Sequence, residues 1–71
     1  MTKLEAFIQS RGIKPAQVAR ESGYSRAQLF RIRMGISEPS ARGVAAIAAA
    51  CRRLTHESVG AVDLFDLGSH Q

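Results

Sequence analysis

The sequence has few of the residues on which several classes of small protein depend. Its single cysteine, Cys51, cannot form an internal disulfide, which argues against a disulfide-stapled secreted scaffold and favours a reducing compartment. The longest apolar run covers residues 44–51, eight residues, and is far too short for a membrane span. The start, Met-Thr-Lys-Leu-Glu, lacks the apolar stretch of a signal peptide. We therefore expect a cytoplasmic protein with no membrane partner.

Side chains suited to metal or covalent chemistry are equally scarce. Cys51, His56 and His70 lack the paired spacing of a zinc site. There is no glycine-rich phosphate loop and no Ser/His/Asp or Cys/His arrangement. A chain of this length buries only about 60% of its unfolded surface, which leaves little room for a catalytic pocket. We expect no enzymatic activity, no metal, no cofactor and no small-molecule substrate.

Acidic residues are outnumbered, and their distribution is uneven. Ten Lys and Arg against six Asp and Glu give a net charge of +4, and eight of the ten cations are arginine. Residues 11–53 hold nine cations and two acids, or +7, whereas residues 54–71 hold three acids and no Lys or Arg. Arginine binds phosphates and guanine edges bidentately, so the basic segment favours a nucleic-acid partner.

Two short helices are predicted in the first third of the chain. Thr2 and Glu5 form a T-x-x-E capping box at the start of the first helix, and Gly12 closes it. The apolar stripe of this helix consists of Leu4, Phe7 and Ile8. The second helix begins near Pro15, a residue suited to the first helical position, and ends at Ser22-Gly23.

The third predicted helix has the clearest start. Ser25 is its cap, and Gln28 completes an S-x-x-Q capping box. Tyr24, which precedes the cap, is placed to pack on Leu29 as a hydrophobic staple, and Gly35 ends the helix. Leu29 and Ile32 are expected to face the core.

Two further helices follow, and no segment alternates with a period of two, so the chain is predicted to be all-α. Ser40 caps the fourth helix, and a short terminal helix is expected around residues 61–65. The inward residues of the fourth helix are Val44, Ile47, Ala48, Cys51 and Leu54, and those of the terminal helix are Val62, Leu64 and Phe65.

The second and third helices, joined through residues 22–25, form the skeleton of a helix-turn-helix. Small Ala19 permits close crossing and Gly23 permits the turn. Together with Val18, Tyr24, Ser25, Leu29, Ile32, Gly35, Pro39, Val44, Ile47, Leu64 and Phe65, they make the sequence resemble the Cro/C1-type (Xre-like) regulators. The resemblance implies one lambda-repressor-like domain of five helices over residues 1–71, with the helix-turn-helix at about residues 15–34. It also implies that the third helix docks in the DNA major groove.

A helical wheel shows which side chains of the third helix point away from the core. Arg26, Ala27, Phe30 and Arg31 lie opposite Leu29 and Ile32. The resemblance implies base contacts by Arg26, Ala27 and Arg31. Arginine can bind the O6 and N7 of guanine, and Ala27 can meet a thymine methyl. Outward Phe30 suits a thymine methyl, a protein partner, or packing along the neighbouring helix.

Residues around this helix are expected to contact phosphates or to support it. They are Lys14, Gln17, Ser25, Gln28, Arg33, Ser37 and Arg42. Lys14 and Gln17 match backbone-contacting positions of the family, and Ser37 lies in a loop that approaches DNA in relatives. The capping box already explains Gln28, and Arg31 and Arg33 also suit the role of solvated surface charges.

These features predict a sequence-specific, double-stranded-DNA-binding transcriptional regulator, a nucleoid-associated repressor that blocks a promoter by occupying an operator. The resemblance also implies a homodimer on a palindromic operator, and residues 55–71 are expected to form the dimerisation element. The apolar residues there, divided between core closure and dimerisation, are Val59, Val62, Leu64, Phe65 and Leu67. The alternative is a protein-interaction or antitoxin-like module of the same fold, in which Phe30 and the acidic end bind a protein.

Overall fold

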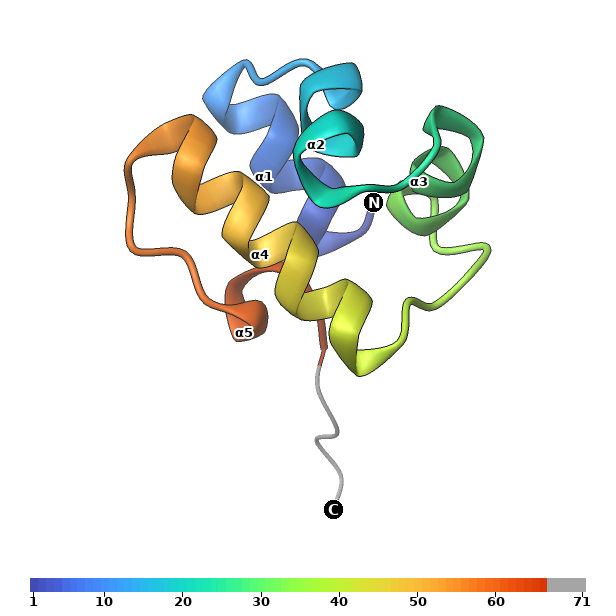
Figure 1. Cartoon of the computed structure of the whole chain (residues 1–71). Coiled ribbons are helices and arrows are strands. Elements are labelled where there is room, and N and C mark those ends of the chain that lie inside the picture. Colours follow the sequence, from blue (N-terminus) through green and yellow to red (C-terminus); the bar gives the residue numbers. More distant parts are fainter. Residues whose placement is uncertain (67–71) are drawn as a thin grey trace.

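The computed structural model describes residues 1–66, and within them all regular structure is helical (Figure 1). The helices are α1 (Lys3–Arg11), α2 (Pro15–Ser22), α3 (Arg26–Arg33), α4 (Ala41–Thr55) and α5 (Ala61–Leu64). The prediction of an all-α domain of five helices is confirmed. Leu67, part of the expected dimerisation segment, lies outside the described residues.

The helices begin and end where local sequence signals place them. The hydroxyls of Thr2, Ser25 and Ser40 accept hydrogen bonds from the third backbone N–H of their helices at 3.0–3.1 Å. At α3 the capping box is complete, because the Ser25 N–H also donates to Oε1 of Gln28 at 2.9 Å. Gly23 ends α2 with φ of 87°, a conformation that glycine adopts without strain.

One predicted capping box is half wrong. Thr2 accepts the N–H of Glu5, but the Glu5 carboxylate does not return to the N-cap backbone. It binds Arg33 of α3 instead, at 2.6 Å. A charged hydrogen bond to arginine at a site largely shielded from water is stronger than a bond to a solvent-accessible backbone amide. The bond to Arg33 therefore determines the direction of the Glu5 side chain.

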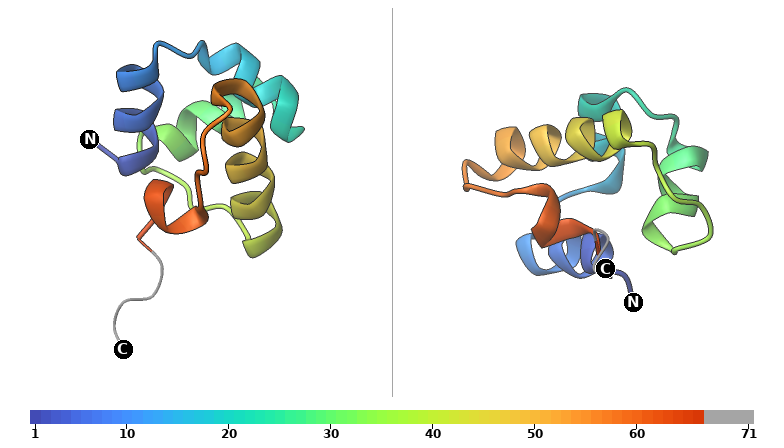
Figure 2. Two further views of the ribbon diagram at one scale, coloured as in Figure 1. Left: turned by 90° about the vertical axis from the view of Figure 1, so that its left-hand side faces the viewer. Right: turned by 90° about the horizontal axis from the view of Figure 1, so that it is seen from below.

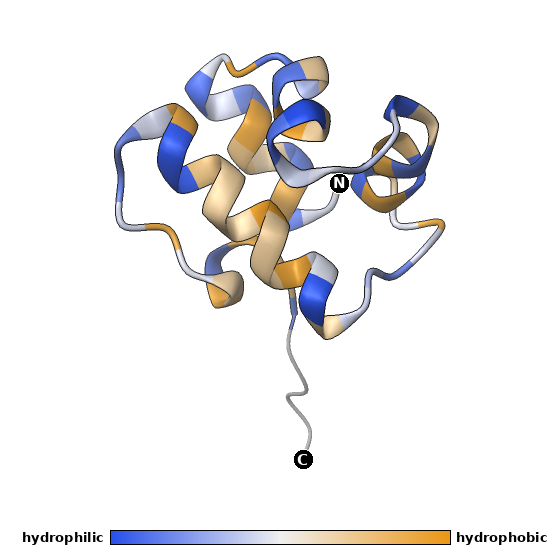
Figure 3. Ribbon diagram, viewed as in Figure 1, coloured by the Kyte–Doolittle hydropathy of each residue, from blue (hydrophilic) through white to orange (hydrophobic). Residues whose placement is uncertain are grey.

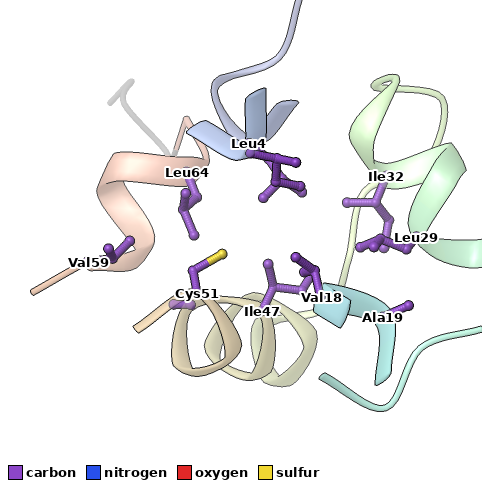
Figure 4. Packing of buried hydrophobic residues seen from close by; sticks show 11 residues of the cluster. Leu4, Val18, Ala19, Leu29, Ile32, Ile47, Cys51, Val59 and Leu64 are labelled. Carbon is purple, nitrogen blue, oxygen red and sulfur yellow. The ribbon is translucent and has the colours of Figure 1, made fainter. Parts of the chain in front are cut away.

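The core lies between the pair α1 and α5 on one side and the pair α2 and α4 on the other (Figure 4). Helix α3 closes it on a third side. Leu4 of α1 and Leu64 of α5 face Ile47 and Cys51 of α4 across it, and α2 packs closely along α4. The other buried members of the core are Ile8, Val18, Ala19, Leu29, Ile32, Ala48 and Val59. Tyr24, Val44 and Leu54 are only partly buried.

The end of the described chain departs from its predicted packing at one residue. Val62, expected in the core, is 64% exposed, whereas Leu64 is 1% exposed. A helix of one turn can bury only one side, and residues two apart point in nearly opposite directions. Val59, considered for a dimer surface, is 4% exposed and belongs to the monomer core.

Two views from other sides show α5 lying beside the start of α1, and the right-hand view shows α3 at one edge of the molecule (Figure 2). Hydrophobic residues line the inner sides of the helices and polar residues the outer sides (Figure 3). Within residues 1–66, no helix is long and apolar enough to cross a bilayer. The same residues contain no cluster of three His, Cys, Asp or Glu side chains able to hold a metal ion.

Candidate nucleic-acid interface

Helix α3 is held from its inner side and leaves its outer side open. Leu29 and Ile32 are 1% and 6% exposed, and the helix packs more closely on α2 than on any other helix. The turn between α2 and α3 contains Gly23, whose left-handed conformation lets the chain reverse in three residues. The two helices thus form a helix-turn-helix with α3 at the edge of the molecule (Figure 1).

The four residues expected to contact bases are together on the open side of α3. Arg26, Ala27, Phe30 and Arg31 are all exposed. Neither Arg26 nor Arg31 forms an ion pair within residues 1–66, so both guanidinium groups are available to a ligand. Two guanidinium groups flanking an apolar strip can read guanine edges and a thymine methyl.

Two arginines away from α3 are paired with acids. Arg11 donates two hydrogen bonds of 2.8 Å to the carboxylate of Glu57, and Arg53 donates one of 2.9 Å to Oε1 of Glu21. Lys3 lies 3.6 Å from Asp66. Acids therefore cancel part of the positive charge away from the outer face of α3.

Most of the basic residues assigned to DNA are not paired in this way. The cations without an ion pair in the described part of the chain are Lys14, Arg20, Arg26, Arg31, Arg42 and Arg52. Of these, Arg52 donates to the carbonyl oxygen of Val59 at 2.7 Å. Arg20, on the exposed surface of α2, has no assigned role from the sequence. Unpaired cations concentrate near the helix-turn-helix, which suits a polyanion.

Arg33 is the exception among the residues assigned to DNA. Its Nε and Nη2 donate to the two carboxylate oxygens of Glu5 at 2.6 and 2.9 Å. The side chains are 17% and 8% exposed, so the pair is largely shielded from water. The hydrogen bonds from Arg33, and a further bond from Gln9, lower the pKa of Glu5 against the opposing effect of burial. The expectation that Arg33 is a solvated surface charge is wrong, because the side chain is shielded and paired. Of its other two expected roles, support of α3 fits this geometry better than phosphate contact.

Phe30 borders a groove between the start of α2 and the outer side of α3. The groove has a volume of about 440 Å³ and is lined by Lys14, Pro15, Ala16, Arg26, Leu29, Phe30 and Arg33. Phe30 remains 50% exposed, and the guanidinium carbon of Arg33 lies 5.8 Å from its ring centroid. The aromatic side chain is therefore half exposed at the edge of this groove, and its cation–π neighbour belongs to its own helix.

The other expected contact residues are divided between the helix-turn-helix and a second groove. Lys14 and Arg42 are exposed beside the starts of α2 and α4, and Gln17 is partly exposed on α2. Ser25 and Gln28 use side-chain atoms in their capping box. Ser37 instead lines a separate groove of about 330 Å³, next to Thr2, Leu4, Ile32 and Leu64.

Two residues of α1's N-terminal turn support α3, and sequence reasoning did not assign them to the site. Thr2 donates its hydroxyl to the carbonyl oxygen of Arg33 at 2.6 Å, and Glu5 binds the side chain of the same residue. A signal for Glu5 existed. It lies beside Leu4 on the inward side of the first helix, where a charge needs a partner.

The buried thiol has no role at this surface. Cys51 is fully buried in the core, and burial raises its pKa from 9.0 to about 11. A thiol with so high a pKa is a poor nucleophile at neutral pH.

Comparison with known proteins identifies the same architecture. A family model described as helix-turn-helix matches residues 4–57, which run from the second residue of α1 to just beyond the end of α4. Neither the curated proteins nor the solved structures give a match. The matched segment contains the turn at Gly23, the capping box of α3 and both inward residues of that helix. The chain belongs to the helix-turn-helix family of the Cro/C1 type, whose members are DNA-binding regulators.

Proposed function

We propose that the protein is a sequence-specific repressor that occupies an operator in double-stranded DNA and thereby blocks a promoter in the nucleoid. The observation that carries this proposal is the open outer side of α3, on which Arg26 and Arg31 are exposed and free of ion pairs. Each guanidinium would bind the O6 and N7 atoms of a guanine in the major groove. Ala27 and Phe30 would fill the space between them and meet apolar base atoms.

Contacts to phosphates would set the position of the helix in the groove. Lys14 and Arg42 supply unpaired charges near two helix starts, where the helix dipole also favours phosphate. Gln17 and Ser37 would donate hydrogen bonds to phosphate oxygens of the DNA backbone. Ser25 and Gln28 would support the start of α3 through their capping box, and the amide NH₂ of Gln28 would still be able to donate to a phosphate. Arg33 would support the end of the helix through its bonds to Glu5. Such contacts give affinity with little sequence preference.

The whole chain would act as one DNA-binding domain that pairs with a second copy through residues 55–71. Val59 and Leu64 are occupied in the monomer core, so Val62 on α5, 64% exposed, is the described residue that suits this contact. A two-fold dimer would present two copies of α3 about 34 Å apart, one turn of DNA. Its operator would be a palindrome.

The test is selection of bound duplexes from a random library, followed by titration of the winner at several salt concentrations. We expect a palindrome whose half-sites are one helical turn apart. The logarithm of the affinity should fall steeply and linearly with the logarithm of the salt concentration, because neutralised phosphates release counterions. Failure to enrich any sequence, with only weak binding to all duplexes, would contradict the proposal.

A second candidate function is binding of a protein partner, in an antitoxin-like manner. The half-exposed ring of Phe30 supports it, because an exposed aromatic side chain suits a protein interface. Under this alternative, Phe30→Ala would abolish partner binding with little dependence on salt. Under operator binding, the same variant would alter base preference and leave the salt dependence of DNA binding in place.

A further inference from the structure

The Arg33 side chain connects the N-terminal helix to the open side of α3. On one side its guanidinium forms the two-point contact with Glu5 of α1, at 2.6 and 2.9 Å. On the other side it lies 5.8 Å from the ring centroid of Phe30, one turn earlier on the same helix. That distance and the charge of the guanidinium are those of a cation–π contact.

The main chain of Arg33 is also bonded to the N-terminal end of α1. Its carbonyl oxygen accepts the Thr2 hydroxyl at 2.6 Å, and Thr2 in turn accepts the N–H of Glu5 at 3.0 Å. Glu5 is itself oriented by Gln9, which donates to Oε2 at 2.9 Å. Both the position of the last turn of α3 and the direction of the guanidinium are therefore set by α1.

This network fixes the surroundings of Phe30 on the side of Arg33. The ring has the guanidinium of Arg33 beside it and the groove wall of Pro15 and Ala16 nearby. Because Glu5 neutralises Arg33, the ring lies next to a cation that is already paired. The side chain is thus, with the smaller Ala27, an apolar point on a face that also presents the charges of Arg26 and Arg31.

The DNA major groove offers such a point one apolar feature, the C5-methyl group of thymine. We propose that Glu5 and Arg33 are positioning residues that hold Phe30 as a reader of a thymine methyl. The inference rests on the proposed DNA-binding function and adds the chemical group that Phe30 would recognise. Glu5, a carboxylate on another helix, then controls base preference without touching DNA.

The experiment uses the duplex enriched by selection, with each thymine of a half-site replaced in turn by deoxyuridine. This replacement removes one methyl group and leaves base pairing intact. For the wild-type protein we expect at least one position at which binding weakens by about fourfold, the effect of taking one methyl out of an apolar contact. Phe30→Ala should lose the discrimination at that position and keep it elsewhere.

The positioning role is tested by the double variant Glu5→Met/Arg33→Met. Replacing both members of a shielded ion pair by apolar side chains of similar length preserves folding better than removing one member, and thermal unfolding verifies it. We expect this variant to bind the selected duplex and to lose at least half of the fourfold discrimination at the Phe30 position. The matched control is Glu21→Met/Arg53→Met, which removes an ion pair between α2 and α4 and should keep full discrimination.

Two results would overturn the inference while leaving the proposed function intact. One is a selected site at which no deoxyuridine replacement weakens binding, or at which Phe30→Ala discriminates as well as the wild type. The other is full discrimination in a folded Glu5→Met/Arg33→Met protein, which would make the pair a stabilising contact only. Absence of any selected site would instead contradict the proposed function itself.

Discussion

The hydroxyl of Tyr24 lies in the place where a side chain on Gly43 would begin. An ideal Cβ on Gly43 would overlap the Tyr24 hydroxyl oxygen and would lie 3.2 Å from Cβ of Pro39. Tyr24 belongs to the turn between α2 and α3, and Gly43 to the first turn of α4. The close contact therefore ties the orientation of the helix-turn-helix to the helix that carries the core.

We expect Gly43→Ala to lower the free energy of unfolding by about 1–2 kcal/mol, because overpacking outweighs the gain in helix propensity. Urea unfolding followed by circular dichroism measures it. In the Gly43→Ala background, Tyr24→Phe should recover part of the loss, since it removes the overlapping oxygen. A Gly43→Ala protein as stable as the wild type would show that the turn moves without cost.

Substituting His56 by glycine should stabilise the protein. His56 ends α4 with φ of 59°, the only non-glycine residue with positive φ in residues 1–66. The left-handed conformation costs a residue with a Cβ about 1 kcal/mol, and glycine is exempt. We expect His56→Gly to raise the free energy of unfolding by about 1 kcal/mol in urea titrations. His56→Ala is the control and should not be stabilised.

Acid should destabilise the fold partly through Glu5. Its pKa in the folded protein is lowered below the ordinary 4.5, chiefly by the hydrogen bonds from Arg33. Because the folded pKa is the lower one, the stabilising contribution is complete above the unfolded value. It is lost as the pH falls through the folded pKa.

The corresponding measurement is the free energy of unfolding of Glu5→Gln and wild type between about pH 7 and pH 3. The variant should be less stable at neutral pH and should lose less stability on acidification. Glu57→Gln is a useful comparison, because the pKa of Glu57 is also lowered, by Arg11, but the pair is exposed and solvent weakens it. Parallel curves for Glu5→Gln and wild type would contradict the assignment.

Removal of a base-reading arginine should cost affinity and specificity together. Arg26→Ala or Arg31→Ala should weaken binding to the selected site by about 1–3 kcal/mol and relax preference at one base pair. Lys14→Ala should weaken all duplexes alike and reduce the salt slope by about one. The control Arg53→Ala removes the same charge from a residue paired with Glu21, and should leave base preference unchanged. Fluorescence anisotropy titrations distinguish these patterns.

The thiol of Cys51 should be protected in the folded protein. With a pKa of about 11 and no exposed surface, it should react with a disulfide reagent at pH 8 at least 100-fold more slowly than in urea. The absorbance of the thiol that is released from the reagent measures the rate of this reaction. Fast reaction in native buffer would show that α4 opens readily.

The fold could be predicted from the sequence where short-range signals govern it. The caps at Ser25 and Ser40 depend on residues three positions away, and the turn at Gly23 depends on one backbone angle. Helical periodicity places Val62 wrongly, because in a helix of one turn it gives little information about which side is buried.

The candidate site was predictable in its composition and less so in its supports. The outward residues of α3 follow from the wheel once Leu29 and Ile32 are placed inside. The partner of Arg33 could not be found in this way, because Glu5 is 28 residues earlier in the chain. Local spacing gives Glu5 a plausible capping role, and only the position of Arg33 next to it in the folded chain decides against that role.

The pairing of Arg11, Arg53 and Lys3 with acids has a kinetic consequence. Cancelling charge on the sides away from α3 gives the molecule an uneven field, so a polyanion exerts a torque on it as well as a pull. An encounter with DNA would then begin with the protein already turned the right way round. A larger fraction of collisions would then lead to binding, and the association rate constant would be higher.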